Sequence, residues 1–210
     1  MKRARPYDRE AALDAAMALF WRKGYHATSL KDLEAALAMK PGSIYAAFRS
    51  KEALFLTSLE RYFQRSLAGL DARMAKAETV LGGLADHLRG FGAPEAPEAE
   101  YRDGARMCMI VKTLVETTEA DGAVAARARE CFDGMRAAFA QWFRRAQEAG
   151  ELPPDADPER LARRYQTEIS ALRLEAHRGG DPAALVELAD ALARDVQAWG
   201  RPETGTARLH

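Results

Sequence analysis

A group of small and polar residues in the first quarter of the chain has the types and spacing of a DNA-reading surface. Gly42, Ser43 and Ala46 fall on the leading side of a short helix that Pro41 would open. A recognition helix enters the major groove with its N-terminal residues toward the base edges, and these small side chains would let it approach closely. The chemistry that this pattern predicts is the noncovalent reading of double-stranded DNA.

Phosphate contacts are expected on either side of that helix. Thr28 or Ser29 can cap the preceding two-turn helix, whose N-terminus would attract an anion, and Asp32 lies three residues after Ser29 as in a capping box. The Tyr45 hydroxyl and the Lys51 ammonium group are further phosphate ligands. A basic arm of Lys2, Arg3 and Arg5 would add affinity that does not depend on sequence. The pattern alone is equally compatible with a plain helical subdomain that uses Tyr45 as a core residue.

No catalytic or metal-binding pattern accompanies this group. The histidines at 26, 87, 177 and 210 have no ligand spacing with one another or with the cysteines, and the Gly-Gly pairs lack a phosphate-loop context. We therefore expect no catalytic residue, no metal, no cofactor and no enzyme activity.

Composition and charge fit a globular regulator. The 210 residues have a formal net charge of zero, yet residues 1–51 hold ten Lys and Arg against five Asp and Glu, as expected where one end meets a polyanion. No apolar run is long enough to cross a bilayer, and the N-terminus does not resemble a secretory signal. A cytoplasmic location without a membrane partner is expected, with Cys108 and Cys131 as free thiols.

Helical periodicity along the whole chain predicts the elements that must position these residues. Apolar residues recur at helical spacing almost everywhere, which indicates an all-α fold. The N-terminal three-helix helix-turn-helix domain would be followed by a C-terminal helical domain for ligand binding and dimerisation. The expected helices are about 7–23, 30–37, 41–48, 51–77, 80–91, 105–118, 121–150, 157–177 and 181–199. Ser50 can cap the fourth of these, and the expected N-caps of the last three are Asp121, Asp157 and Asp181.

Three segments follow from these helices. We expect a DNA-binding domain at 1–50, an effector-binding and dimerisation domain at 51–200 and a flexible tail at 201–210, with a Pro-rich and Gly-rich loop within the second segment. The last two helices are assigned to the dimer interface, with core packing as the alternative. Their apolar seam comprises Leu161, Tyr165, Ile169, Leu172, Leu185, Leu188, Leu192 and Val196.

The run FWRKGYHATSLKDLEAALAMKPGSIYAAFRSKEALF resembles the DNA-binding signature of the TetR/AcrR family of repressors. This resemblance implies an Ω-shaped homodimer of nine-helix subunits on a palindromic operator, with Tyr45 and Lys51 on the phosphate backbone. The matching residues are Phe20, Lys23, Gly24, Tyr25, Thr28, Ser29, Gly42, Ser43, Ile44, Tyr45, Phe48, Ser50, Lys51, Leu54 and Phe55.

The chain departs from the family pattern at the turn before the recognition helix. Ala38 replaces the usual turn glycine and would be strained if that position has a positive φ. Lys40-Pro41 replaces the usual Ser-Lys, so Lys40 is expected to meet phosphate in place of the missing lysine. These departures mean that an operator sequence cannot be carried over from relatives.

The resemblance also implies an inducer site in the later helices. Candidate lining residues are Phe63, Met107, Cys108, Trp142 and Tyr165. We expect a transcriptional repressor whose operator binding is relieved by a small-molecule inducer. One alternative is an electrophile or redox sensor acting through Cys108, which matches a cysteine position of one TetR subgroup. The other is an effector-free, sequence-tolerant DNA-binding protein.

Overall fold

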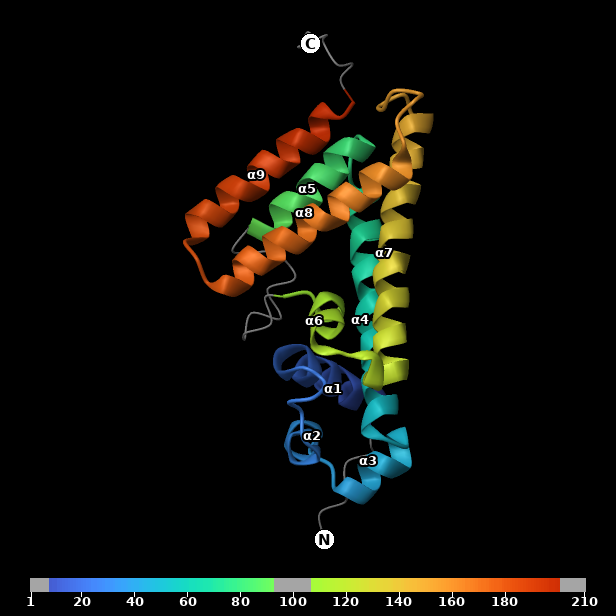
Figure 1. Ribbon diagram of the computed structural model, residues 1–210, viewed down its shortest axis with the longest axis vertical. Helices are drawn as coiled ribbons and strands as arrows, with labels where there is room; N and C mark the ends of the chain where they lie inside the picture. Colours follow the sequence, from blue (N-terminus) through green and yellow to red (C-terminus); the bar gives the residue numbers. More distant parts are fainter. Residues whose placement is uncertain (1–7, 93–106, 201–210) are drawn as a thin grey trace. The chain divides into compact units, whose positions relative to one another are not determined.

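The computed structural model describes residues 8–92 and 107–200. Within these ranges the chain forms nine α-helices and one short 3-10 helix, with no strand, which confirms the all-α prediction (Figure 1). The predicted arm at Lys2, Arg3 and Arg5 and the tail at 201–210 lie outside the described residues. The helices are α1 Arg9–Lys23, α2 Leu30–Leu37, α3 Pro41–Phe48, α4 Lys51–Met74, α5 Val80–Gly92, α6 Met109–Glu116, η2 Glu119–Asp121, α7 Gly122–Glu148, α8 Pro158–Arg178 and α9 Pro182–Ala198.

Most helix starts carry the predicted caps. The Asp157 side chain accepts from the first backbone N–H groups of α8, and Asp181 does the same for α9, each followed by proline at the first helical position. Ser50 Oγ accepts from Ala53 N at 2.9 Å near the start of α4. Asp121 differs from the prediction, since its carboxylate accepts from Thr118 N within η2 rather than capping α7.

The helices form two compact units. Unit 1 contains the described residues of Met1–Arg65 and Asp103–Phe132, and unit 2 contains those of Ser66–Arg102 and Asp133–His210. Residues of α6 and the first part of α7 therefore belong with the first three helices, although they come after residue 100. This grouping is one of packing, and the functional division at residue 50 stays a prediction.

Unit 1 has an apolar core between α1 and α4. The rings of Phe20 and Phe55 meet edge to face, with centroids 5.0 Å apart, and Trp21 meets Tyr62 in the same way at 4.9 Å. Leu33 of α2 and Ile44 of α3 are also buried. The ring contacts hold α1 against α4.

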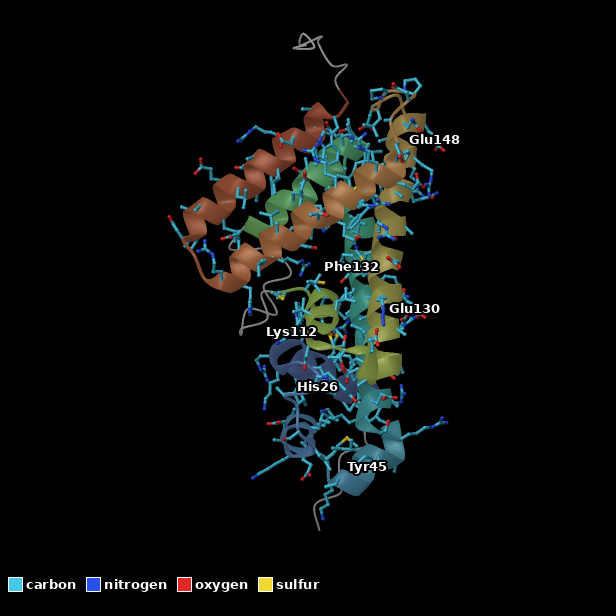
Figure 2. All side chains as sticks on the ribbon, in the orientation of Figure 1. His26, Tyr45, Lys112, Glu130, Phe132 and Glu148 are labelled. Atoms are coloured by element: carbon cyan, nitrogen blue, oxygen red, sulfur yellow. The ribbon has the colours of Figure 1, made fainter. Side chains whose placement is uncertain are left out.

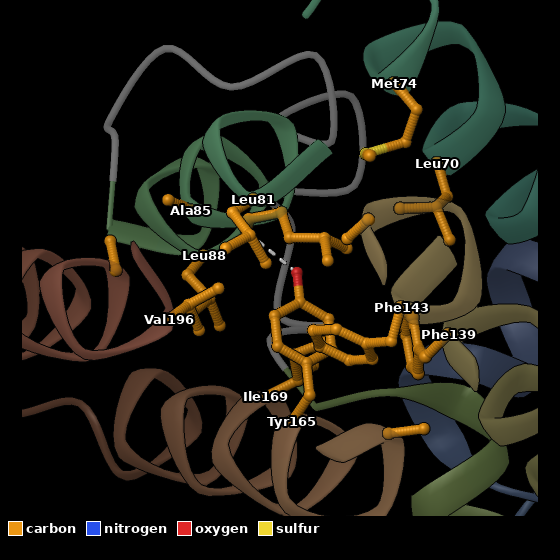
Figure 3. Close-up of a cluster of buried hydrophobic side chains, with 14 of the residues drawn as sticks. Leu70, Met74, Leu81, Ala85, Leu88, Phe139, Phe143, Tyr165, Ile169 and Val196 are labelled. Carbon is orange, nitrogen blue, oxygen red and sulfur yellow. Dashed lines mark hydrogen bonds between the residues drawn. The ribbon is translucent and has the colours of Figure 1, made fainter. Parts of the chain in front are cut away.

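Unit 2 has an apolar core of its own, to which the end of α4 and helices α5, α7, α8 and α9 contribute (Figure 3). Tyr165, Ile169, Leu172 and Val196 are buried in this core of a single chain. Core packing, the alternative to a dimer seam, is therefore correct for these four residues. Their side chains are already covered by the chain's own helices and leave no free face for a partner.

Candidate nucleic-acid interface

The face of α3 has the form expected of a recognition helix. Ile44 and Phe48 are buried, whereas Gly42, Ser43 and Ala46 are exposed. The Tyr45 side chain is 46% exposed, and Figure 2 shows it on α3. A Cβ atom added at Gly42 would meet nothing within 4 Å, so the space in front of this position is open. The helix thus presents small side chains outward and is held from behind by two large ones.

The start of α2 is held by the predicted capping box. Ser29 Oγ accepts from Asp32 N at 3.2 Å, and Asp32 Oδ2 accepts from Ser29 N at 2.8 Å. Lys23 Nζ lies 2.8 Å from Asp32 Oδ1. This lysine, together with Ser29, holds the pKa of the Asp32 carboxyl well below its usual range. The capping contacts therefore persist as the pH falls well into the acid range.

Thr28 has a structural part in the same turn. Its side chain is fully buried, and its hydroxyl donates to the Gly24 carbonyl at 2.6 Å. That geometry leaves only the backbone of Thr28 for the predicted phosphate contact. Ser29, in contrast, is exposed at the helix start.

The turn between α2 and α3 shows the strain expected at Ala38. Its φ of 52° and ψ of 37° are left-handed, a conformation that disfavours a side chain. Lys40 then takes the N-cap position of α3 in extended conformation, and Pro41 follows at the first helical position, as predicted. Both residues are exposed, so both lie open to a nucleic acid.

Lys51, the first residue of α4, is half-buried. Its Nζ lies 4.6 Å from the centroid of the Tyr25 ring. Burial lowers the pKa of Lys51, while the nearby carboxylates of Glu116 and Asp32 raise it. Burial likewise raises the pKa of Tyr25, with smaller contributions from Glu52 and Asp121. The aromatic ring thus lies against the ammonium group that is predicted to meet phosphate.

A charged network braces α4 against α1. Arg61 donates to both carboxylate oxygens of Asp14, at 2.6 and 3.1 Å, and to Glu10 at 2.5 Å. Arg65 reaches Asp14 at 2.6 Å. Two-point contacts between arginine and carboxylate fix orientation as well as distance. The helix that begins with Lys51 is therefore fixed in rotation relative to α1.

Helix α6 makes a set of polar contacts with the end of α1 that the sequence analysis did not predict. Glu116 accepts from Tyr25 N and His26 N, and Lys112 donates to the carbonyls of Trp21 and Arg22. Lys112 and His26 are labelled in Figure 2. The one available signal was a lysine and a glutamate four positions apart in an otherwise apolar helix, the spacing that places two side chains on one face.

The residues predicted to line an inducer site are divided between the units. Phe63, Met107 and Cys108 belong to unit 1, and Trp142 and Tyr165 to unit 2. The Met107 carbonyl accepts from Trp21 Nε1 at 2.5 Å, Cys108 is the half-buried N-cap of α6, and Arg145 stacks on the Trp142 ring at 4.3 Å. That these five residues line an inducer site stays a prediction.

Tyr165 forms a buried polar pair with His87 that the sequence did not indicate. Its hydroxyl donates to the Leu84 carbonyl at 2.8 Å, the bond drawn dashed in Figure 3, and lies 2.9 Å from His87 Nδ1. Because the hydroxyl has one proton, His87 Nδ1 must be the donor to its oxygen. Burial lowers the His87 pKa to about 3, helped by Arg73 and Arg173, so the ring is neutral at physiological pH.

Among the described residues, no group of three or more His, Cys, Asp and Glu side chains could hold a metal ion. No helix in the described ranges is long and apolar enough to span a membrane.

Comparison with known proteins identifies an N-terminal and a C-terminal region of the chain. Residues 12–57 match the model of bacterial regulatory proteins of the tetR family, and residues 98–192 match that of the tetracyclin repressor-like C-terminal domain. The transcriptional repressor ComR of Escherichia coli is 32% identical over 195 residues, which cover 91% of each chain. The regulator YezE of Bacillus subtilis is 28% identical over 165 residues, covering 78% of this chain and 82% of the relative.

Solved structures show the same fold. The TetR family regulator CifR, in a cysteine mutant bound to a 26 bp double-stranded operator, superposes with a TM-score of 0.77 at 30% identity, covering 91% of this chain and 98% of that one. The regulator FadR of Bacillus subtilis, solved with stearoyl-CoA, is 14% identical with a TM-score of 0.71, which shows the fold alone. These relatives are regulators, in agreement with the prediction that the chain is not an enzyme. The chain belongs to the TetR family of bacterial transcriptional regulators.

Proposed function

We propose that the protein is a dimeric repressor that binds a palindromic operator through α3 and releases it when a small molecule binds the C-terminal helices. The observation that carries the DNA-binding part is the face of α3, where Gly42, Ser43 and Ala46 are exposed and Ile44 and Phe48 are buried. The E. coli relative is a repressor, and CifR was solved on operator DNA.

The proposed dimer uses the apolar side chains that α8 and α9 leave exposed, which include Leu188 of the predicted seam. Leu174 is 54% exposed on α8, and Val186 and Leu188 are 40% and 37% exposed on α9. Large apolar side chains left in solvent by one chain are suited to burial against a second copy. Two recognition helices would then read half-sites about 34–36 Å apart, one turn of the duplex.

Relief by an effector requires that DNA and effector favour different arrangements of the dimer. By linkage, an effector that weakens operator binding about 5- to 150-fold must bind the DNA complex more weakly by the same factor. Titration of an inducer into free protein and into the operator complex measures both constants. Equal affinities for an inducer that releases DNA would contradict this coupling.

The DNA-binding part is tested by selection of genomic fragments with the purified protein in about 0.15 M salt. We expect one short palindrome. Tyr45→Ala should weaken binding without changing its salt dependence, because the hydroxyl is neutral. Lys51→Ala should weaken binding and reduce the slope of log K against log salt by about one, as for one lost phosphate contact.

Lys76→Ala is the matched control, since Lys76 is an exposed lysine of unit 2. Fragments that share no motif, or selection unaffected by both substitutions on the proposed interface, would overturn the operator-binding proposal. That outcome would favour the sequence-tolerant, effector-free alternative.

A thiol input through Cys108 is the second candidate for the signal. Burial raises the pKa of Cys131 to about 11, so this thiol stays protonated and unreactive at neutral pH. Cys108 is half-buried at the start of α6 and is the more accessible of the two. If it senses electrophiles, alkylation will release operator from the wild type and not from Cys108→Ser. Equal release from both proteins would remove this candidate.

A further inference from the structure

We propose that Glu116 and Lys112 of α6 are positioning residues for operator binding. Together they form a clamp, defined here as these two side chains and the turn from Trp21 to His26 that they hold. The inference rests on the proposed DNA-binding function and adds two residues that lie far along the chain from the helix-turn-helix. Both side chains and the turn that they hold belong to unit 1.

Glu116 holds two successive backbone N–H groups just after α1. Its Oε2 accepts from Tyr25 N at 3.1 Å and its Oε1 from His26 N at 2.5 Å, across 91 and 90 positions of sequence. A carboxylate that accepts two N–H groups fixes both the place and the orientation of the peptide units. The turn is therefore fixed to α6 rather than only to its own neighbours.

The lack of a side chain at Gly24 leaves the space that this carboxylate occupies. The Gly24 φ of 89° is unfavourable for any side chain, and a Cβ atom there would lie 2.4 Å from Glu116 Oε2. A glycine needed only to end α1 would not also need that space. The close approach shows that the turn and the Glu116 side chain are fitted to each other.

Lys112 holds the other side of the same turn. Its Nζ donates to the Arg22 carbonyl at 2.7 Å and the Trp21 carbonyl at 3.3 Å, near the C-terminal end of α1, where a cation is favoured. Burial lowers the pKa of Lys112, and the Glu116 charge raises it. One turn of α6 thus meets the last carbonyls of α1 with a cation and the next N–H groups with an anion.

The clamped turn leads directly to the groups that would meet phosphate. The Gly24 carbonyl accepts the Thr28 hydroxyl, which comes immediately before Ser29, the N-cap of α2. The Tyr25 ring, whose own backbone N–H is bonded to Glu116, carries the Lys51 ammonium group at 4.6 Å. Loss of the clamp would therefore loosen two phosphate contacts at once.

Electrostatics and positioning predict opposite results for Glu116→Gln. Removing a negative charge beside Lys51 should by itself strengthen binding to DNA, which is a polyanion. Losing one of two backbone hydrogen bonds to the carboxylate should weaken binding, by roughly 10-fold if the bond is of the charged kind. Glu119→Gln is the matched control, because it removes an exposed carboxylate nearby without touching the turn.

The experiment measures operator affinity of the full-length protein over a range of salt, with the operator found by fragment selection. We expect Glu116→Gln, Glu116→Ala and Lys112→Met to weaken binding about 10-fold or more and to flatten the salt slope by about one, while Glu119→Gln binds as well as wild type or better. Hydrogen exchange should become faster at the amides of Tyr25 and His26 in both Glu116 variants.

Three results would separate the possible failures. Wild-type affinity and slope in Glu116→Gln and Lys112→Met would overturn the clamp while leaving the proposed function intact. Weaker binding with an unchanged slope, in proportion to a smaller folded fraction, would also overturn it, because a merely structural contact lowers the active concentration without removing phosphate contacts. A wild-type protein that selects no operator would overturn the proposed function itself.

Discussion

Three helices of unit 1 are shorter than any helix of unit 2, and the contacts that hold them differ accordingly. In unit 1, α2, α3 and α6 have eight residues each and bury two, two and three side chains. In unit 2, α5 and α8 have 13 and 21 residues, of which six and five are buried. A helix as short as eight residues is marginal without tertiary support. Caps, ion pairs and side-chain contacts to backbone groups therefore matter most for these three helices.

The difference fits the work proposed for each unit. A surface that meets DNA must leave the outer sides of α2 and α3 uncovered, so those helices cannot be buried on all sides. Helix α2 is held instead by the Ser29 cap and by the turn before it, which Glu116 contacts. Unit 2 has no such demand on its core helices and packs them around Phe139, Phe143 and Tyr165. Substitutions in the core of unit 2 should accordingly lower the free energy of unfolding. Substitutions at the contacts that hold the short helices of unit 1 should act on DNA binding.

The largest loss of stability is expected for Phe143→Ala in unit 2. The ring is fully buried and meets Tyr165 edge to face at 5.7 Å. Removing it should lower the free energy of unfolding by about 3–5 kcal/mol, since the cavity cannot close fully. Urea unfolding measures the change. Gln141→Ala is the control, because Gln141 lies two residues earlier in α7 and is exposed. A loss below about 1.5 kcal/mol would mean that this core relaxes, and the contrast between units would weaken.

His87 should make unit 2 sensitive to acid. Its pKa is about 3 in the fold against an ordinary value of 6.5, so between these values the unfolded chain binds a proton that the folded chain does not. Stability is therefore kept above pH 6.5 and lost as the pH falls toward 3, by up to about 1.4 kcal/mol per pH unit.

His87→Gln should flatten this dependence when urea midpoints are compared at about pH 7, 6 and 5. His26→Gln serves as the control, because His26 is an exposed histidine of unit 1. An unchanged pH slope in His87→Gln would show that other groups cause the acid sensitivity.

A smaller loss is expected from the cap of α2. Ser29→Ala removes the side chain that accepts from Asp32 N and should lower the free energy of unfolding by about 1 kcal/mol. Ser29→Gly should lower the free energy of unfolding by only about a few tenths of a kcal/mol, because glycine is tolerated at the N-cap position. Equal losses in thermal or urea unfolding for the two variants would contradict a capping role.

The smallest effect, with the opposite sign, is expected at Ala38. Ala38→Gly relieves a left-handed φ of 52° and should raise the free energy of unfolding by less than about 1 kcal/mol. Ala36→Gly, two residues earlier inside α2, should lower it by about 1 kcal/mol. Two losses of similar size would show that Ala38 is not strained.

Local sequence was sufficient for the helices, most of their caps and the shape of α3. The spacing of apolar residues, the Ser29–Asp32 box and Pro41 all act over four residues or fewer, so their effects can be recognised without a fold. The positive φ at Ala38 was expected only from the family resemblance, because relatives usually have a glycine at this turn.

Tertiary structure decided which distant residues complete these local elements. Glu116 meets Tyr25 across 91 positions of sequence, and His87 meets Tyr165 across 78. No local pattern shows which residue is the partner in either pair. Tertiary structure also decided that Tyr165 and Val196 face the chain's own core, since periodicity shows that a helix has an apolar face but not what covers it. Local sequence sets the backbone within a helix, whereas side-chain partners depend on which helices the fold brings together.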